Sequence, residues 1–353
     1  MKIALISDPK RTNYPEAIQQ TYHQTLQHVI ESIALVIQGL GHVFKHFEAD
    51  HQLRNGLIHF KPHLVFNRSN RVGQEKGSAS TPRLLDQLGI PYTGPKAQNC
   101  VTAFNKAKTK SILRKLGLRT ANFVTFTDPA KVHRPEGISF PLIVKLLQGG
   151  GSVRIERNNL VFTNEALKRI CTTLITNFNQ PVIVESFING REFTIGIMGN
   201  DRPKVLPILE FIHQSEEDYH FRSFTTKMNA DKCEKKSCPA ALSRREKGEI
   251  IDLAVRTYQA IGCRDYARID MRFDKDHIPY VLEVNAFPSL IPGGSSFAYM
   301  AEAGGLTFEA LIQRILGIAM KRNQAAIASI STILSPQSWV KRETQPKSPS
   351  SPH

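Results

Sequence analysis

The sequence predicts an α/β protein in which a parallel sheet comes first and antiparallel strands follow. Over about the first 95 residues, apolar strand-like runs alternate with amphipathic helical segments, as in a parallel sheet. From Arg191 to Phe211, apolar and polar residues alternate, which is typical of an antiparallel sheet. Two further strand-like runs then flank the short turn Asp274–His277. Together, these three observations predict that the chain contains both a parallel sheet and antiparallel strands.

The first unit is expected to end near residue 95. Its longest helix follows from apolar residues that recur at helical spacing and from the glycines that close it, Gly39 and Gly41. The predicted elements are a strand at Lys2–Ser7, a helix at Pro15–Gly39, strands at His42–Phe47 and His63–Phe66, a helix at Pro82–Leu88, and a short strand at Gly89–Gly94.

The rest of the chain continues with both element types and ends in a polar segment. The predicted helices are Gln98–Leu116, which is basic and closed by Gly117, then Asn164–Thr176, Ser243–Gly262 and Phe308–Ile318. The predicted strands are Phe123–Phe126, Leu142–Lys145, Val182–Phe187, Ala267–Phe273 and Pro279–Val284. Residues 323–353 are expected to form a basic, disordered tail, because the composition turns to Lys, Ser, Pro and Gln.

Composition excludes several classes of protein. The chain has 353 residues, with 41% hydrophobic and 22% charged, which suits two to four packed units and not a coiled coil or a disordered chain. The longest apolar run, Ile33–Ile37, is far shorter than the roughly 20 residues that a membrane span needs. Five cysteines without metal-ligand spacing indicate a reducing compartment, so we expect a cytoplasmic protein that does not act at a membrane.

The net charge of +15 indicates an anionic partner. That partner could be a nucleic acid, a membrane surface or a phosphorylated small molecule. The basic residues are spread along the chain, and no basic block is interleaved with aromatic residues, which argues against nucleic acid. We therefore expect small-molecule partners and no nucleic acid, with nucleic-acid binding kept as an alternative.

Charged residues between apolar ones in the two C-terminal strands are the strongest chemical signal. Arg268 and Asp270 share one face of their strand, and Glu283 and Asn285 share one face of the next. The short turn brings Asp270 opposite residues 281–283. Three oxygen ligands without Cys or His suit Mg²⁺, and a neighbouring arginine suits a phosphoryl group in transfer. A hairpin with surface salt bridges is the alternative interpretation.

Two weaker signals lie upstream. Lys145 ends a predicted strand ahead of Gly149–Ser152, where an ammonium and backbone N–H groups could meet phosphates, although a plain hairpin turn fits equally well. The strand and turn at Val182–Thr194 could bond an adenine edge through backbone groups. Glu185 and Glu192 could bind the adenine amine and the ribose hydroxyls, or they could be ordinary solvated carboxylates.

In this order, these segments resemble the ATP-grasp superfamily, and specifically the D-alanine–D-alanine ligase group. The resemblance covers roughly residues 60–320 and is most specific in Tyr266–Pro288, Val182–Thr194 and Gly89–Gly94. It implies three α/β units: an N-terminal substrate-side unit with a parallel sheet at residues 1–95, and two units at residues 96–187 and 188–322 whose sheets clamp ATP.

The resemblance also implies a reaction and its residues. The reaction is that of an ADP-forming carbon–nitrogen ligase, which phosphorylates a carboxylate with ATP and joins it to an amine, with ATP and two Mg²⁺ (or Mn²⁺) as cofactors. Arg268 would be catalytic, and Asp270, Glu283 and Asn285 would bind metal. The implied nucleotide-binding residues are Lys106, Lys145, Gly150, Gly151, Ser152, Glu185, Phe187, Ile188, Glu192 and Lys227.

The segments that would hold the first substrate depart from the family pattern. Ser7–Asn13 lacks the family's glycine pair, Ser and Glu, and Asn67–Gln74 replaces a loop with His-Gly. Gly151 and Met228 replace a Ser and a Tyr. The residues expected to contact the substrates are Arg68, Arg71, Ser289, Gly294, Ser295 and Ser296, of which Ser289 replaces a Gly and Gly294 a Ser.

A matching nucleotide half with a different substrate half predicts the same reaction on a different acceptor. One candidate is a ligase of the mycosporine type, which activates a vinylogous acid and adds an amino acid. A D-alanine–D-alanine ligase or another dipeptide ligase is an alternative, and so is an inactive ATP-binding regulatory protein. The family resemblance also allows a homodimer.

Overall fold

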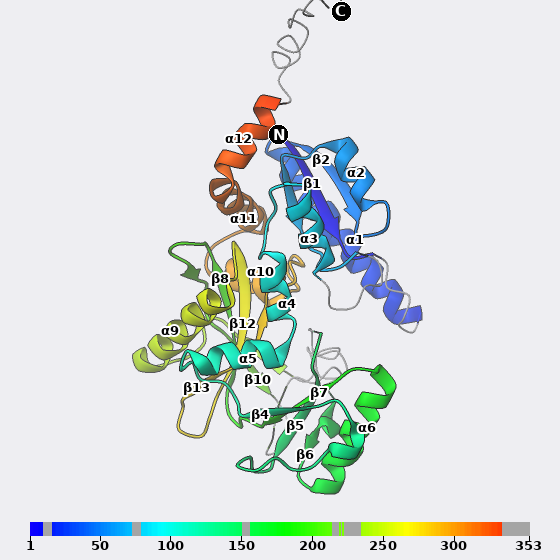
Figure 1. Cartoon of the computed structure of the whole chain (residues 1–353). Coiled ribbons are helices and arrows are strands. Elements are labelled where there is room, and N and C mark those ends of the chain that lie inside the picture. The colour runs from blue at the N-terminus through cyan, green and yellow to red at the C-terminus, as the bar shows by residue number, and fades with distance from the viewer. Residues whose placement is uncertain are drawn as a thin grey trace, which may run out of the picture.

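Three sheets organise the chain, as shown by a computed structural model in which residues 1–9, 16–72, 79–149, 156–213, 219, 221 and 234–333 are described (Figure 1). One sheet has the strand order β2-β1-β3, the second β4-β7-β5-β6, and the third β11-β10-β8-β12-β13, with β9 paired to β8. The N-terminal sheet is parallel and the other two are antiparallel, which confirms the predicted fold class.

The N-terminal sheet packs between helices. Its strands are β1 (Lys2–Ser7), β2 (Val43–Glu48) and β3 (Leu64–Asn67), and its helices are α1 (Glu16–Gly39), α2 (Leu53–Phe60) and α3 (Ser80–Gln87). Helix α2 was not predicted because it contains Gly56 and Asn55, both poor helix formers, but burial of Leu53 and Leu57 holds it. The strand predicted at Gly89–Gly94 is reduced to one parallel bridge, from Val65 to Tyr92.

The single helix predicted at Gln98–Leu116 is wrong, because the chain forms two helices there. Helix α4 (Ala97–Ala103) ends before Asn105, which is extended, and α5 (Lys106–Lys115) begins after it. The Asn105 side chain accepts a hydrogen bond from the backbone N–H of Lys108, as an N-cap does. The break places Lys106 at the start of a helix, beside the segment that follows the strand at 142–146.

The middle sheet carries one long helix on its face. The strands are β4 (Phe123–Phe126), β5 (Leu142–Leu146), β6 (Leu160–Val161) and β7 (Val182–Ser186). Helix α6 (Asn164–Phe178) buries its apolar face against β5 and β7, and the short 3₁₀ turns η1 (Pro129–Lys131) and η2 (Arg157–Asn159) complete the unit. Strands β5 and β7 lie side by side, so Lys145 and Glu185 can meet.

The C-terminal sheet is the largest, and helices cover both of its faces. Its strands are β8 (Glu192–Met198), β9 (Lys204–Val205), β10 (Leu209–His213), β11 (Glu234–Ser237), β12 (Tyr266–Phe273) and β13 (Pro279–Asn285). Helix α9 (Arg244–Ile261) packs on one face, and α10 (Ser296–Ala303) and α11 (Phe308–Arg322) share a core with α1 on the other. The antiparallel strands confirm the alternation seen from Arg191 to Phe211.

The expectation of a disordered tail from residue 323 is wrong at its start. Residues Gln324–Ile333 form α12, because this stretch is rich in Ala and Ile and lacks Pro and Gly. The rest of the expected tail, residues 334–353, lies outside the described residues.

Among the described residues, no single helix has the length and apolar character to cross a membrane. Helices α10 and α11 meet that criterion only as a pair bent by 101°. Both contribute side chains to the buried core.

A buried carboxylate, Asp265, ties the N-terminal unit to the C-terminal sheet. It is fully buried, and it accepts two hydrogen bonds from the Arg322 guanidinium at 3.0 and 2.7 Å. It also accepts one bond from the backbone N–H of Gly94 and one from the Asn200 side chain. Arg264 donates to the carbonyl of the same Gly94. This carboxylate therefore helps to join the first and last units, together with the hydrophobic cluster that α1, β1 and β3 share with α10 and α11.

We expect Asp265→Ala to lower the free energy of unfolding by about 3–5 kcal/mol, because it removes a fully buried carboxylate and leaves the half-buried Arg322 guanidinium without its counter-charge. Chemical denaturation measures this change. The matched control is Asp252→Ala, which removes an exposed carboxylate paired with Arg256 on α9 and should cost about 0.5 kcal/mol or less. Equal losses in the two variants would contradict the role given to Asp265.

Candidate functional site

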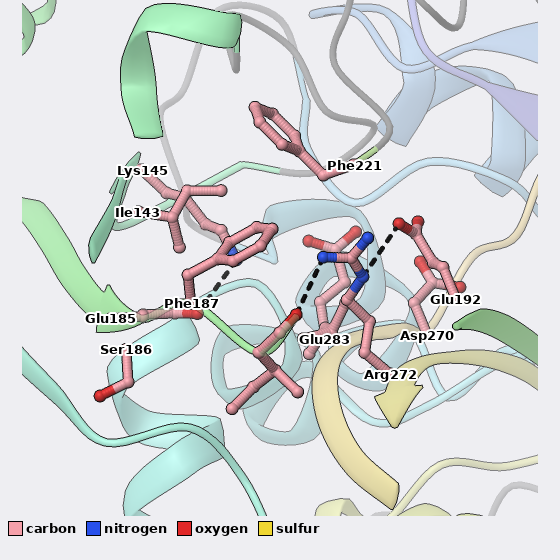
Figure 2. Close-up of a pocket in the computed structure, with 12 residues that line it drawn as sticks. Ile143, Lys145, Glu185, Ser186, Phe187, Glu192, Phe221, Asp270, Arg272 and Glu283 are labelled. Carbon is pink, nitrogen blue, oxygen red and sulfur yellow. Dashed lines mark hydrogen bonds and ion pairs between the residues drawn. The ribbon is translucent and has the colours of Figure 1, made fainter. Parts of the chain in front are cut away.

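A pocket lies between the middle sheet and the C-terminal sheet. Figure 2 shows its residues coming from β5 and β7 on one side and from β8, β12 and β13 on the other. The lining residues are Ile143, Lys145, Glu185, Ser186, Phe187, Ile188, Glu192, Phe221, Asp270, Arg272, Leu282 and Glu283. The pocket therefore combines an apolar wall with several charged groups.

Glu185 is a buried carboxylate held by lysines. Its Oε2 lies 3.0 Å from the Lys145 ammonium and 3.4 Å from that of Lys110, which also donates to the Thr120 hydroxyl. Burial raises the pKa of Glu185, but the charges of Lys110, Lys145 and Lys106 outweigh it and hold the pKa below its usual value. Burial lowers the pKa of Lys110 to about 8. Both members of the Lys110–Glu185 pair are charged near neutral pH.

One oxygen of Glu185 has no hydrogen-bond partner among the described residues. This atom, Oε1, is buried, although Glu185 lines the pocket. Most buried polar atoms in proteins are hydrogen-bonded, so an unpaired acceptor at a pocket wall needs an explanation. A donor group on a bound molecule would supply the missing bond.

Glu192 and Arg272 form a second charged pair at the opposite wall. Arg272 Nε lies 3.4 Å from Glu192 Oε2. Arg272 Nη1 donates a hydrogen bond of 2.9 Å to the Ile188 carbonyl. The guanidinium also lies over the Phe187 ring, 4.9 Å from its centre. The other contacts of that ring include Phe221, edge-on at 5.9 Å between centres. The Phe187 ring therefore lines the pocket while it packs against Arg272 and Phe221.

Arg268, Asp270, Glu283 and Asn285 converge as the sequence predicts. In the pairing of β12 with β13, Arg268 lies opposite Asn285 and Asp270 opposite Glu283. Arg268 donates two hydrogen bonds to Asp270, each 2.9 Å, and Asn285 Nδ2 donates a third of 2.8 Å. A β-bulge follows Asp270, and it leaves Leu282 and Glu283 both at the pocket.

The donors at this hairpin fit a hard divalent cation. Two carboxylates and an amide oxygen are the ligand types that Mg²⁺ takes, and Asn285 bonds Asp270 through its nitrogen, which leaves its oxygen available. The described residues contain no group of three or more His, Cys, Asp or Glu side chains arranged for a metal. The amide of Asn285 therefore has to complete any such set with Asp270 and Glu283.

Lys106 lies between the two charged regions. Its ammonium donates to the carbonyl of Gly149 at 2.8 Å and lies 3.9 Å from a Glu283 oxygen. Burial lowers the pKa of Lys106, and the carboxylate of Glu283 partly opposes this shift. Lys106 therefore connects the segment after β5 to the Glu283 carboxylate on β13.

The other predicted site residues are not all in this pocket. Gly150, Gly151, Ser152 and Lys227 lie outside the described residues, as does Met228. Arg68 and Arg71 follow β3 in the N-terminal unit.

The serine set lies just after β13. Ser295 caps α10, since its hydroxyl accepts from the N–H groups of Ala298 and Ile291 and donates to the Ile291 carbonyl. Ser296 is buried as the first residue of α10, and Gly294 bonds Ile291 through its backbone. Ser289 is half-buried and does not line the pocket. The hydroxyl of Ser295 is thus already used within the fold.

Sequence reasoning missed Lys110 and Arg272. Lys110 lies within a helix rich in lysine, so it looked like part of a solvated face, and only its contact with Glu185 across the fold shows its burial. Arg272 is four residues beyond Arg268 on the same strand and therefore shares its face, a signal that could have identified it.

Comparisons with known proteins give a consistent result. Residues 112–317 match the family described as D-ala D-ala ligase C-terminus. The chain is 28% identical over 335 residues to an uncharacterised protein, y4sG, of Sinorhizobium fredii (91% of this chain, 98% of the relative). It is 31% identical over 243 residues to a D-alanine–D-alanine ligase of Desulforudis audaxviator (68% and 76%).

A solved structure shows the same fold. The crystal structure of D-alanine–D-alanine ligase from Bacillus anthracis complexed with ATP matches with a TM-score of 0.71 and 22% identity. The match covers 92% of this chain and 99% of that chain. This likeness supports the arrangement of the units and of the two antiparallel sheets.

We expect Lys110→Met to lower the free energy of unfolding by about 3 kcal/mol, because Glu185 would lose one of its buried counter-charges. Denaturant titration measures this change, with the exposed Lys108→Met as matched control. The double variant Lys110→Met/Glu185→Gln should recover part of the loss, since it removes both buried charges. The pairing would be refuted if Lys110→Met cost no more than Lys108→Met.

Proposed function

Because this chain belongs to the D-alanine–D-alanine ligase family, we propose that it activates an oxygen acid with ATP and joins it to the amine of an amino acid. As a member of this family it is an ATP-grasp, ADP-forming ligase. The observation that carries the proposal is the pocket, into which both Lys145–Glu185 and Asp270–Glu283 open. Phosphate-binding and metal-binding side chains thus face one space.

The proposed nucleotide position follows from the residues on the two sides of the pocket, those of β5 and β7 and those of β8, β12 and β13. The adenine lies along Phe187, where the unpaired Oε1 of Glu185 can accept from its amine. Lys145 and Lys106 meet the phosphates, because their ammonium groups lie between Glu185 and Glu283. Glu192 binds the ribose hydroxyls while it keeps its contact with Arg272.

The proposed reaction has two transfers. An oxygen of the acceptor acid bonds to the γ-phosphorus as the bond to the β-phosphate oxygen breaks, which releases ADP. The amine nitrogen of the amino acid then bonds to the activated carbon, loses a proton, and inorganic phosphate leaves. Two divalent cations, held by Asp270, Glu283 and Asn285, would neutralise phosphate charge. Arg268 meets the negative charge that develops on the transferred group.

The acid that accepts the phosphoryl group has more than one candidate. The altered segments Ser7–Asn13 and Asn67–Gln74 support an acceptor other than D-alanine. A mycosporine-type vinylogous acid is one candidate, and the carboxylate of a dipeptide partner is another. The amine donor in both cases is an amino acid.

We expect the purified protein to release ADP from Mg-ATP only when an acid and an amino acid are both present. Release should stop when EDTA removes the cation, and Glu283→Gln should lower the rate by about 100-fold or more. A coupled assay for ADP, run on a metabolite extract and followed by mass spectrometry of the product, measures this. The control, Glu302→Gln, changes an exposed residue of α10. Unchanged turnover in Glu283→Gln would refute the metal assignment.

A further inference from the structure

Two hydrogen-bond donors at the junction of the N-terminal unit and the C-terminal sheet have no partner in the part of the chain that the structure describes. Tyr266 on β12 is fully buried, and its hydroxyl has no hydrogen-bond partner among the described residues. The Nη1 atom of Arg68, which directly follows β3, is also buried without a partner. A buried tyrosine hydroxyl usually finds a partner, and a buried guanidinium nitrogen without one is costly.

Tyr266 belongs to the same face of β12 as the proposed catalytic arginine. Because side chains alternate along a strand, Tyr266, Arg268 and Asp270 all project from one face. Successive residues on that face are about 7 Å apart. The row therefore runs from Asp270, which lines the pocket, through Arg268 to Tyr266, which does not line it.

Arg68 reaches this row from the N-terminal unit. Its backbone N–H donates to the Ile6 carbonyl, which fixes it at the carboxyl end of the parallel strands β1 and β3. Phe66, the second-last residue of β3, and Tyr266 lie in the same hydrophobic cluster as Phe297 of α10. The carboxyl ends of parallel strands are where α/β sheets commonly bind ligands.

The electrostatics agree with this placement. Burial raises the pKa of Tyr266 to about 12, and the positive charge of Arg68 partly opposes that shift. Asp8 and Tyr22 also act on Arg68. Asp8 accepts a hydrogen bond from the Ser69 hydroxyl at 2.6 Å, and Arg68 Nη1 has no partner within residues 1–9, 16–72 or the other described ranges.

We propose that Arg68 and Tyr266 bind a second anionic group of the acid that Arg268 helps to activate. The acceptor is then a dianionic acid, such as a dicarboxylate, with its two acidic groups separated by about one step of the β12 face. A guanidinium and a phenol hydroxyl together suit a carboxylate, because both donate and one carries a permanent positive charge. This inference rests on the proposed function.

Binding of matched acids tests the inference. The probes are malonate, succinate and glutarate, each compared with the monoacid of equal length (propionate, butyrate and valerate), in the presence of Mg²⁺ and a non-hydrolysable ATP analogue. Thermal stabilisation gives the half-saturating concentration of each acid. At least one diacid should bind the wild-type protein more tightly than its monoacid, and Arg68→Met should weaken that diacid about 10- to 100-fold.

Two controls separate binding from folding. Arg54→Met changes an exposed arginine of α2 and should leave the preference for the diacid intact. Tyr266→Phe should reduce the preference without lowering the melting temperature, because its hydroxyl makes no hydrogen bond to any residue that the structure describes. Tyr258→Phe, in contrast, removes a bond to the Gly199 carbonyl and should lower the melting temperature.

The outcomes are distinguishable. Equal binding of diacids and monoacids, or a preference that survives Arg68→Met, would overturn the inference and leave a bound water as the partner of the two donors. Failure of the proposed function would look different, since the ATP analogue with Mg²⁺ would then give no stabilisation before any acid was added.

Discussion

The alignment of β12 between β8 and β13 determines where the charges of the site lie. It places Asp270 beside Thr194 on one side and Glu283 on the other, and Arg268 beside Asn285. A shift by one residue would turn every one of these side chains to the opposite face, which is packed against α9. The bulge after Asp270 matters for the same reason, because it returns Val281 to the core while Leu282 stays at the pocket.

Burial of Glu185 is possible only because the middle unit brings lysines to it from two different elements. Lys145 comes from the neighbouring strand β5 and Lys110 from helix α5, and the break at Asn105 sets where that helix begins. An isolated buried carboxylate would take up a proton instead of keeping its charge. The lysines therefore keep Glu185 ionised, and its Oε1 atom, which has no partner among the described residues, is the acceptor that the proposed function assigns to the adenine amine.

Local patterns were sufficient for the hairpin, because the alternation of Arg268 and Asp270 and the short turn are both contained in about twenty residues. Long-range contacts were not predictable in this way. The contact of Lys110 with Glu185 and the contact of Asp265 with Arg322 join segments far apart in the sequence, and each residue alone resembles an ordinary surface charge. The helix break at Asn105 was missed because lysines and alanines on both sides favour a continuous helix.

Charge compensation differs between the two ends of the site. A carboxylate offers about four acceptor positions, and Asp270 already accepts from Arg268 twice, from Asn285 and from Thr194. On the proposed function, Asp270 can ligate a cation only by releasing one of these donors. If the released donor is Arg268, its guanidinium becomes available to the transferred phosphoryl group at the moment when the site is loaded. At the Arg68–Tyr266 end, no such exchange is needed with the described part of the chain, where neither donor has a hydrogen-bond partner. On these proposals, the nucleotide end rearranges when its ligands bind, whereas the Arg68–Tyr266 end does not have to.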